Sequence, residues 1–556
     1  MSVQGRPDGR SLRALSTIVI VLAAVVMYGP TVRDYFLQDD FGVVGLFSQR
    51  PVSYFPRWFV APWTEDIWGY VPDEIRPFPA LSYVVMSWFG AAAPEPNHVV
   101  NIAVHAVNGL LVMGIAEAAA GLALVPAMFA GLVFVLLPIQ AESVAWVTGR
   151  VDSLPTCFYF ASFLLYVRSI RLKADATDGS PPDAGRSKRL YWGSVALFFA
   201  ALFSKQNTIT MAPALVLFDW IVGRRRIEVS WRWLRPYVPY VVLTVGFLAL
   251  RYVLFHEVAR ESILSAQRVQ EFLSDSSRHL VRLVFGGPGV RQWTWRDTGW
   301  IVGIAFLIAY AVPRVFDKIR FSTGSTWRAV VYFGLIWLAL GMAPILVSGY
   351  YSPRHMYLAS LGWAAVLGAA LEMLWYGAPA ITRRFLAVVF AGALLFGYGS
   401  QLHGVVREWN QYAAISRAAV VQIEQEAASN PDGTLVIAGV PRLSWAFAVP
   451  HAVRPPFTTT DLTKRIFVIS DSFDHCCNAL LWNEYTRSAL RAWHDRPDHP
   501  PVVAVYWNPR TGRMSRVSDR DDPQLRTLAS LLMETESRES LDSVIRGLLN
   551  DYVALR

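Results

Sequence analysis

Long apolar segments alternate with short polar ones along most of the chain. A helix needs about 20 apolar residues to cross ~30 Å of hydrocarbon, and the pattern predicts about eleven such spans. They lie near residues 13–33, 97–117, 121–138, 153–171, 190–204, 207–222, 237–255, 299–314, 328–348, 356–376 and 385–402. The pattern therefore predicts a mainly α-helical polytopic membrane protein.

One further apolar run, from Phe78 to Gly90, is shorter than these spans. Its length of about 13 residues is too short to cross a bilayer comfortably. We interpret it as a re-entrant or surface-lying helix within a first outer loop of about residues 34–96. A true span here would invert every later loop.

Composition supports a membrane protein. The chain has 556 residues, of which 54% are hydrophobic and 17% charged, and its mean hydropathy is +0.33. These values exclude an ordinary soluble protein. The net charge of +9 is typical of cytoplasmic loops that set the topology, so no nucleic-acid partner is expected.

The basic loops predict which side each segment faces. Arginine and lysine gather before the first span and near residues 171–189, 224–235, 314–328 and 383–384. An odd number of spans places all of these loops in the cytoplasm, which satisfies the positive-inside rule. We therefore expect an integral protein of the bacterial inner (plasma) membrane. Residues 1–14 would be cytoplasmic, 15–402 would form the transmembrane domain and 403–556 would lie outside.

The C-terminal part has a different pattern. Strand-like runs occupy residues 434–440, 465–470 and 502–507. Helical stretches are expected near residues 408–428, 478–494, 523–535 and 539–553. Together these elements predict a small α/β domain on the extracytoplasmic side.

Acids and bases from distant segments fall on the same predicted outer face. The first outer loop contributes Asp39, Asp40 and Arg76, and the second contributes Glu142, Arg150 and Asp152. Lys205 ends the fifth span, and Arg354 and His355 precede the tenth. Carboxylates beside a bilayer are expensive to hold there, so they indicate a functional site.

The charges suggest a class of chemistry. A carboxylate accepts a proton from an attacking hydroxyl or holds a divalent cation. Lysine and arginine bind phosphate and neutralise a phosphate leaving group. The combination suggests transfer from a lipid-linked phosphate donor. The alternative is that Glu142, Arg150 and Asp152 satisfy one another and only orient the loops.

A polar stripe follows one face of the helix expected near 97–117. His98, Asn101, His105 and Asn108 recur at spacings of three, four and three, which places them on one face. Such faces usually hold helices together inside membranes, and the pattern favours that interpretation. The alternative is that His98, nearest the outer surface, reaches the active site.

Several of these motifs resemble the membrane half of the GT-C glycosyltransferases. They are the Asp39–Asp40 pair, Arg76-Pro77 before a short apolar helix, the His98, Asn101 and His105 pattern, and segments 142–152, 204–219 and 354–361. The resemblance is to the protein O-mannosyltransferase-like branch, which often carries tetratricopeptide repeats. Repeats of about 34 residues are not visible in this C-terminal part.

The resemblance implies a GT-C-like bundle that transfers one sugar with inversion. The donor would be a polyprenyl-phosphate sugar in the membrane lipid, and the acceptor a protein, a glycan or a lipid-linked glycan. Asp39 or Asp40 would be the base. Glu142 and Asp152 would bind the acceptor or a metal, for which Mg or Mn is the candidate. Lys205, Arg354 and Arg150 would hold the donor phosphate, and Arg76, His98 and His355 would line the site.

Two other functions compete with a glycosyltransferase. A transporter or flippase of lipid-linked glycans often shows internal repeats and broken helices at mid-membrane, whereas the ionisable residues here gather at one face. A non-catalytic envelope assembly protein has no need for adjacent acids beside lipid. The sequence therefore favours the enzyme.

Overall fold

The structure of the protein is a computed structural model. This structure describes residues 9–65, 74–91, 93–175, 184–223, 230–258, 266–286, 327–348, 352–376, 381–438, 440–441, 445, 451–469, 502–508 and 511–516. The chain packs into two compact units. Unit 1 comprises Met1–Pro30, Ile75–Pro79 and His98–Arg407, and unit 2 comprises Thr31–Glu74, Ala80–Asn97 and Glu408–Arg556.

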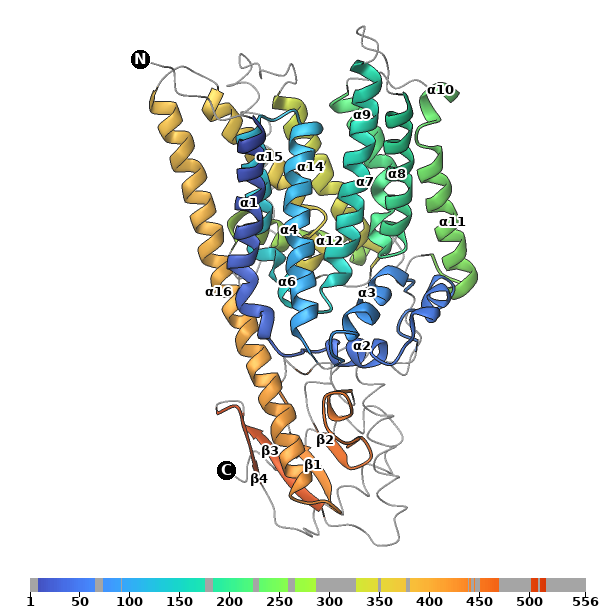
Figure 1. Cartoon of the computed structure of the whole chain (residues 1–556), viewed down its shortest axis with the longest axis vertical. Helices are drawn as coiled ribbons and strands as arrows, with labels where there is room; N and C mark the ends of the chain where they lie inside the picture. The colour runs from blue at the N-terminus through green and yellow to red at the C-terminus, as the bar shows by residue number, and fades with distance from the viewer. Residues whose placement is uncertain are drawn as a thin grey trace. The chain divides into compact units, whose positions relative to one another are not determined.

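Unit 1 is helical, and its long helices run side by side in Figure 1. The α-helices that lie wholly or mostly in this unit are α1 (Gly9–Tyr28), α4 (Glu95–Ala118), α5 (Leu124–Leu136), α6 (Ala141–Ala145), α7 (Arg150–Asp175), α8 (Ala184–Leu202), α9 (Met211–Ile221), α10 (Trp231–Leu234), α11 (Val238–Phe255), α12 (Ala266–Phe285), α14 (Trp327–Met342), α15 (Ser360–Tyr376) and the first part of α16 (Ile381–Ala428). Short 3-10 helices connect them: η3 (Pro138–Gln140), η5 (Gln206–Thr210), η6 (Ala343–Val347) and η7 (Pro353–Met356).

The predicted spans coincide with helices wherever the structure describes them. Only the span predicted at 299–314 lies outside the described residues. By length and apolarity, five helices among the described residues are able to cross a membrane. A sixth is added if α5 and the segment Pro138–Ala145, bent by 51°, count as one span. The apolar helices thus confirm a membrane protein, while the number eleven stays a prediction.

Glycines allow the helices of unit 1 to approach closely. A Cβ on Gly131 of α5 would lie 2.7 Å from the carbonyl oxygen of Gly109 on α4. A Cβ on Gly362 of α15 would lie 2.2 Å from the carbonyl oxygen of Gly334 on α14. Small residues at such crossings let membrane helices pack backbone to backbone. A larger side chain at any of these four positions would push the helices apart.

Buried polar side chains join neighbouring helices of unit 1. Ser162 of α7 and Ser194 of α8 each donate a hydrogen bond to the other's carbonyl oxygen, at 2.8 and 2.6 Å. Asp219 of α9 accepts from the hydroxyls of Tyr166 and Tyr237, at 2.9 and 2.5 Å. Polar groups buried away from water need such partners, so these contacts fix α7 and α9 in register.

Unit 2 combines the first loop with the C-terminal part of the chain. Its helices are η1 (Gly29–Arg33), α2 (Asp40–Phe47), η2 (Val52–Phe59), α3 (Pro77–Ser87), the end of α16 and η8 (His451–Val453). Its strands are β1 (Thr434–Ala438), β2 (Ile466–Ile469), β3 (Val502–Asn508) and β4 (Arg513–Arg516). The sheet order is β2-β1-β3-β4, with β2 and β3 parallel to β1 and β4 antiparallel to β3.

The end of α16 is tied to this sheet by polar contacts. Gln422 accepts a hydrogen bond from the backbone N–H of Met514 at 2.7 Å, and Glu426 pairs with Arg516 at 3.1 Å. The guanidinium of Arg465 donates to the carbonyl oxygens of Ala427 and Asn430. Basic side chains commonly satisfy the last carbonyls of a helix in this way. Arg465 therefore anchors the C-terminal end of α16 beside β2.

The strands lie where the sequence placed three of them, and β4 was not predicted. Its residues Arg513 to Arg516 lack the β-branched and aromatic side chains that mark a strand. A separate helix was expected near 408–428, and its predicted start was wrong. Instead, α16 runs unbroken over 48 residues from Ile381 to Ala428. The helices expected near 478–494, 523–535 and 539–553 lie outside the described residues. The domain boundaries stay predictions.

Candidate functional site

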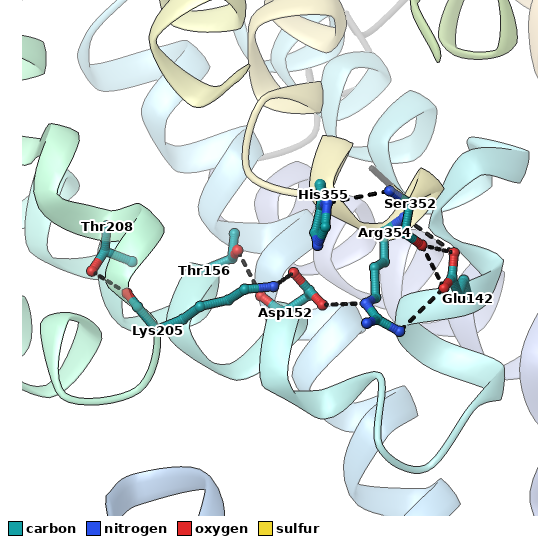
Figure 2. A network of polar contacts seen from close by, with 8 residues as sticks. All are labelled: Glu142, Asp152, Thr156, Lys205, Thr208, Ser352, Arg354 and His355. Carbon is teal, nitrogen blue, oxygen red and sulfur yellow. Dashed lines mark hydrogen bonds and ion pairs between the residues drawn. The ribbon is translucent and has the colours of Figure 1, made fainter. Parts of the chain in front are cut away.

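A chain of alternating charges crosses the described part of unit 1, as Figure 2 shows. The ammonium of Lys205 donates to Asp152 Oδ1. Asp152 Oδ2 lies 3.5 Å from Nε of Arg354, and Nη1 of Arg354 lies 3.3 Å from Oε1 of Glu142. Four predicted site residues from segments more than 200 residues apart are therefore brought together.

The charged side chains are buried to different degrees. The side chain of Asp152 is 2% exposed and that of Lys205 is 9% exposed, whereas Arg354 and Glu142 keep 14% and 19%. Removing charges from water is costly unless each charge is paired. Asp152, the most buried of the four, accordingly has a cation on either side.

Local structure explains why Asp152 and Lys205 meet. Asp152 is the third residue of α7, where the helix N-terminus favours a negative charge. Lys205 has extended backbone between α8 and η5, and its carbonyl oxygen accepts from the hydroxyl of Thr208 at 2.9 Å. The break in the helix thus directs the Lys205 side chain towards the start of α7 (Figure 2).

Glu142 holds the short helix that carries Arg354. Its carboxylate accepts from the hydroxyl of Ser352 at 2.6 and 2.8 Å and from the backbone N–H of Arg354 at 3.3 Å. It therefore caps η7 from a different segment, as carboxylates do at helix starts. The guanidinium of Arg354 also lies 4.8 Å from the ring centre of Trp146, a cation–π distance.

Burial changes the protonation of two basic side chains in this network. The pKa of Lys205 is lowered to about 8, mainly by burial and also by Arg76 and Arg354, although Asp152 acts in the opposite direction. Burial also lowers the pKa of His355 well below its usual value, with Lys205 and Arg354 contributing. His355 is therefore neutral, which fits its Nδ1 accepting from the N–H of Ser352 at 3.3 Å.

The polar stripe of α4 connects helices, as the favoured interpretation predicted. The amide of Asn101 donates to the carbonyl oxygens of Val144, Trp146 and Val147, at 2.9 to 3.3 Å. It also accepts from Nε of Arg150 at 2.8 Å. Asn101 thereby fixes the segment between Glu142 and Asp152. The hydrogen bond from Arg150, which is fully buried, connects this residue to α4. The role of Arg150 in binding the donor phosphate stays a prediction.

The next residues of the stripe bind the segment that follows Arg354. His105 contacts the hydroxyl of Tyr357 through Nδ1 at 2.7 Å and the carbonyl oxygen of Val135 through Nε2 at 3.1 Å. Asn108 donates to the hydroxyl of Tyr357 at 3.1 Å and to the carbonyl oxygen of Ser153 at 2.9 Å. His98 is 1% exposed, and its suggested role in the site stays a prediction.

The Asp39–Asp40 pair lies in unit 2, at the start of α2. Asp39 is the residue before the helix and Asp40 its first residue. Asp40 is 1% exposed, and its Oδ2 accepts from the backbone N–H of Leu37 at 3.0 Å. Gln38 adopts a left-handed backbone with φ of 49°. A tight turn therefore sets the direction of both carboxylates, while their expected approach to the charges of unit 1 stays a prediction.

Sequence reasoning missed three residues of these two sites. Ser352 and Trp146 contact Glu142 and Arg354, but neither was singled out as a site residue, although Trp146 lies in the segment 142–152. Asp34 lies five residues before Asp39, and burial raises the pKa of its carboxyl to about 7. Its position at the end of the first apolar run was the signal that could have drawn attention to it.

Glu142 and Asp152 contact cations, a hydroxyl and a backbone N–H. Among the described residues, no group of three or more His, Cys, Asp or Glu side chains could hold a metal ion. Asp152 faces Lys205 and Arg354, and Glu142 accepts from Ser352 and Arg354. A metal ion bound to Glu142 or Asp152 would have to displace these partners, and metal binding by these two residues stays a prediction.

Similarity to known proteins was found over part of the chain. No family model matches the sequence. Human protein O-mannosyl-transferase TMTC1 is 29% identical over 208 residues, which cover 35% of this chain and 22% of the relative. Drosophila melanogaster protein O-mannosyl-transferase Tmtc2 is 30% identical over 208 residues, which cover 36% of this chain and 21% of the relative. The chain thus spans about a fifth of the curated relatives it matches.

Solved structures with a similar course of the chain were also found. ArnT from Cupriavidus metallidurans, bound to undecaprenyl phosphate, has a TM-score of 0.47 and 14% identity, over 89% of this chain and 93% of that one. Oligosaccharyltransferase AglB from Archaeoglobus fulgidus has a TM-score of 0.45 and 10% identity, over 92% of this chain and 75% of that one. The sequence relatives confirm the predicted resemblance to protein O-mannosyltransferases.

Proposed function

We propose that the protein is a membrane glycosyltransferase that moves one sugar from a polyprenyl-phosphate donor to an extracytoplasmic hydroxyl. The similarity to relatives named protein O-mannosyl-transferases supports this function. The observation that carries it is the buried charge network of Lys205, Asp152, Arg354 and Glu142. Such a network suits a phosphate-bearing lipid donor better than it suits helix packing alone.

The balance of charge in the network favours an anionic ligand. Lys205, Arg354 and Arg76 act electrostatically on the same buried region, and the described carboxylates that pair there are Asp152 and Glu142. Burial lowers the pKa of Lys205, and Arg76 and Arg354 act in the same direction. A bound phosphate would supply negative charge and further stabilise the charged form of the ammonium.

The proposed reaction needs one base and one stabilised leaving group. The acceptor oxygen forms a bond to the anomeric carbon, while the bond from that carbon to the phosphate oxygen breaks. The proton of the hydroxyl passes to Asp39 or Asp40, and the electron pair leaves with polyprenyl phosphate. Lys205 and Arg354 neutralise the charge that develops on this phosphate. Attack opposite the leaving group inverts the anomeric centre.

The proposed sugar and acceptor are based on the names of the relatives. The relatives' names indicate mannose and a protein hydroxyl, and a glycan or lipid-linked glycan hydroxyl has the same chemistry. The part of this chain that resembles them covers about a third of its length. We therefore define the substrate class as a polyprenyl-phosphate sugar with a hydroxyl acceptor.

The test is a transfer assay with the full chain in lipid nanodiscs. Polyprenyl-phosphate sugars with labelled mannose, glucose, galactose or arabinose would be incubated with serine- and threonine-containing peptides and with free glycans. Release of polyprenyl phosphate together with a glycosylated acceptor is expected for one donor. Movement of an unchanged donor across proteoliposomes, without release of polyprenyl phosphate, would instead show a flippase.

The same proposal fixes the orientation of the chain. A site that uses outer-leaflet donors needs the first loop and the segment after residue 402 outside the cytoplasm. A periplasmic reporter fused after Arg556 should therefore be active, and one inserted near residue 180 should be inactive. An inactive reporter after Arg556 together with an active one near residue 180 would contradict the proposed topology.

A further inference from the structure

The Asp39–Asp40 turn is surrounded by side chains from the C-terminal part of unit 2. We propose that Ser416, Trp445 and Phe457 are positioning residues that hold this turn in place. The inference rests on the proposed function, in which Asp39 or Asp40 is the base. We refer to these three residues as the C-terminal clamp.

Hydrogen bonds fix the backbone just before the two acids. Ser416 of α16 donates its hydroxyl to the carbonyl oxygen of Phe36 at 2.7 Å. The indole N–H of Trp445 donates to the same hydroxyl at 3.2 Å, so it orients the Ser416 proton towards Phe36. Ser416, Trp445 and Phe36 are all fully buried. In such surroundings an unmade hydrogen bond is costly, and the Phe36 carbonyl is held firmly.

Aromatic packing fixes the backbone just after the acids. The ring of Phe457 packs edge-on against Phe41, with 4.9 Å between centroids, and against Phe36 at 5.3 Å. Trp445 packs against Phe41 at 6.2 Å. These separations and tilted geometries are the favourable ones for aromatic pairs. The acids are thus flanked on both sides by rings that contact the clamp.

The ring of Phe457 also lies close to α2 one turn after Phe41. A Cβ on Gly45, one turn after Phe41, would lie 3.4 Å from a ring atom of Phe457. Asp40 is turned by its own bond to the N–H of Leu37, which lies between Phe36 and the pair. Fixing Phe36 and Phe41 therefore also fixes the carboxylates between them.

The clamp is itself anchored on α16. The N–H and hydroxyl of Thr459 both donate to Glu424 at 2.6 Å. Leu462 donates its N–H to the carbonyl oxygen of Val453 at 2.9 Å, which closes the segment around Phe457. The link between β1 and β2 is therefore braced on the helix that carries Ser416. The C-terminal part of the chain would thereby position the proposed base.

A displaced base should slow transfer without weakening donor binding. Misplacement of a reacting group by about 1 Å can lower a rate by about 100-fold. The donor phosphate is assigned to Lys205 and Arg354 in unit 1, so loosening of the turn should leave the donor Kd unchanged. This separation distinguishes positioning from a general loss of folded protein.

The experiment compares clamp variants with a matched control in the full chain. Ser416→Ala and Phe457→Ala should lower kcat by about 10- to 100-fold, with donor affinity unchanged. Ser416→Thr keeps the hydroxyl and should restore the rate. The control is Val505→Ala, a buried position on β3 that removes packing from the sheet. It should lower the melting temperature by a similar amount and leave kcat unchanged.

Hydrogen exchange tests the clamp independently of any transfer. Amides of residues 36–47 should exchange at least about tenfold faster in Ser416→Ala and Phe457→Ala than in Val505→Ala. Unchanged exchange in both clamp variants would overturn the inference, whatever the activity. A different result would be fast exchange in the clamp variants but full activity in Asp39→Asn and Asp40→Asn. That result would support the clamp contacts and overturn the assignment of the base.

Discussion

The two acidic sites of the molecule are held in opposite ways. In unit 1, Asp152 lies between the cations of Lys205 and Arg354. Ion pairs therefore hold its carboxylate in place. In unit 2, the turn of Asp39 and Asp40 is held by a backbone hydrogen bond and by aromatic packing around Phe36 and Phe41. Hydrogen bonds and ring contacts of the neighbouring residues thus hold this turn.

The difference separates two roles that one residue type can play. The carboxylate of Asp152 is engaged by the two cations beside it. Its value lies in setting the positions of Lys205 and Arg354. The Asp39–Asp40 turn is positioned through its neighbours Phe36 and Phe41. Under the proposed function, phosphate binding belongs to unit 1 and proton transfer to the turn in unit 2.

The largest expected effect comes from removing the proposed base. Asp39→Asn or Asp40→Asn should lower kcat by about 10²–10⁴-fold, which is the usual contribution of a general base. Donor affinity should stay unchanged because the phosphate is held elsewhere. Initial rates with labelled polyprenyl-phosphate sugar and a separate donor-binding assay measure the two quantities.

Asp34 provides the competing assignment in the same loop. The pKa of its carboxyl is raised to about 7 by burial, which also suits a base near neutral pH. Loss of activity in Asp34→Asn, with full activity in Asp39→Asn and Asp40→Asn, would move the base to Asp34. It would also remove the contrast drawn between Asp152 and the pair.

The second effect concerns the charge network. Lys205→Met removes a cation from a buried pair, and such changes cost about 3–5 kcal/mol of stability. It should also weaken donor binding by at least about tenfold. Thermal melting and donor titration check the two parts. Lys188→Met, at an exposed position of α8, is the control and should change neither.

A double variant separates stability from binding in this network. In Asp152→Asn with Lys205→Met, no uncompensated charge remains between these two positions, so much of the lost stability should return. Donor binding should remain weak because the cation is still missing. Recovery of donor binding in the double variant would show that Lys205 serves only to neutralise Asp152.

The third effect is a dependence on pH. Because the pKa of Lys205 is lowered to about 8, its ammonium is charged below pH 8 and loses its proton as the pH rises above that value. The KM for the donor should therefore rise above pH 8, by up to about tenfold per pH unit. Lys205→Arg keeps its charge throughout this range, and its KM should stay flat.

The elements of this molecule were easier to predict than its contacts. Apolar runs of span length marked α1, α4 and α11 because membrane helices must be long and apolar. Polar residues suggested a stop near 402, but they do not break a helix, and α16 continues to Ala428. Sequence cannot show that Ser352 meets Glu142 across 210 positions.

The candidate site was predictable only as a set of residues. Charge asymmetry in the loops brought Glu142, Asp152, Lys205 and Arg354 to one face, and the structure pairs them. The order of pairing depends on the break before η5 and on the cap of η7, which are tertiary features. The C-terminal clamp had no signal at all, because Phe36 and Phe457 meet through folding alone.

The smallest expected effect tests the neutral contacts inside unit 1. Tyr357→Phe removes one hydroxyl, which leaves Nδ1 of His105 and the amide of Asn108 without this partner. Membrane hydrogen bonds of this kind contribute about 0.6 kcal/mol on average, so a small fall in thermal stability is expected. Because Tyr357 lies one turn after Arg354, the donor Kd should rise by less than about threefold. A loss of donor binding as large as in Lys205→Met would mean that neutral contacts, and not charges alone, determine the phosphate site.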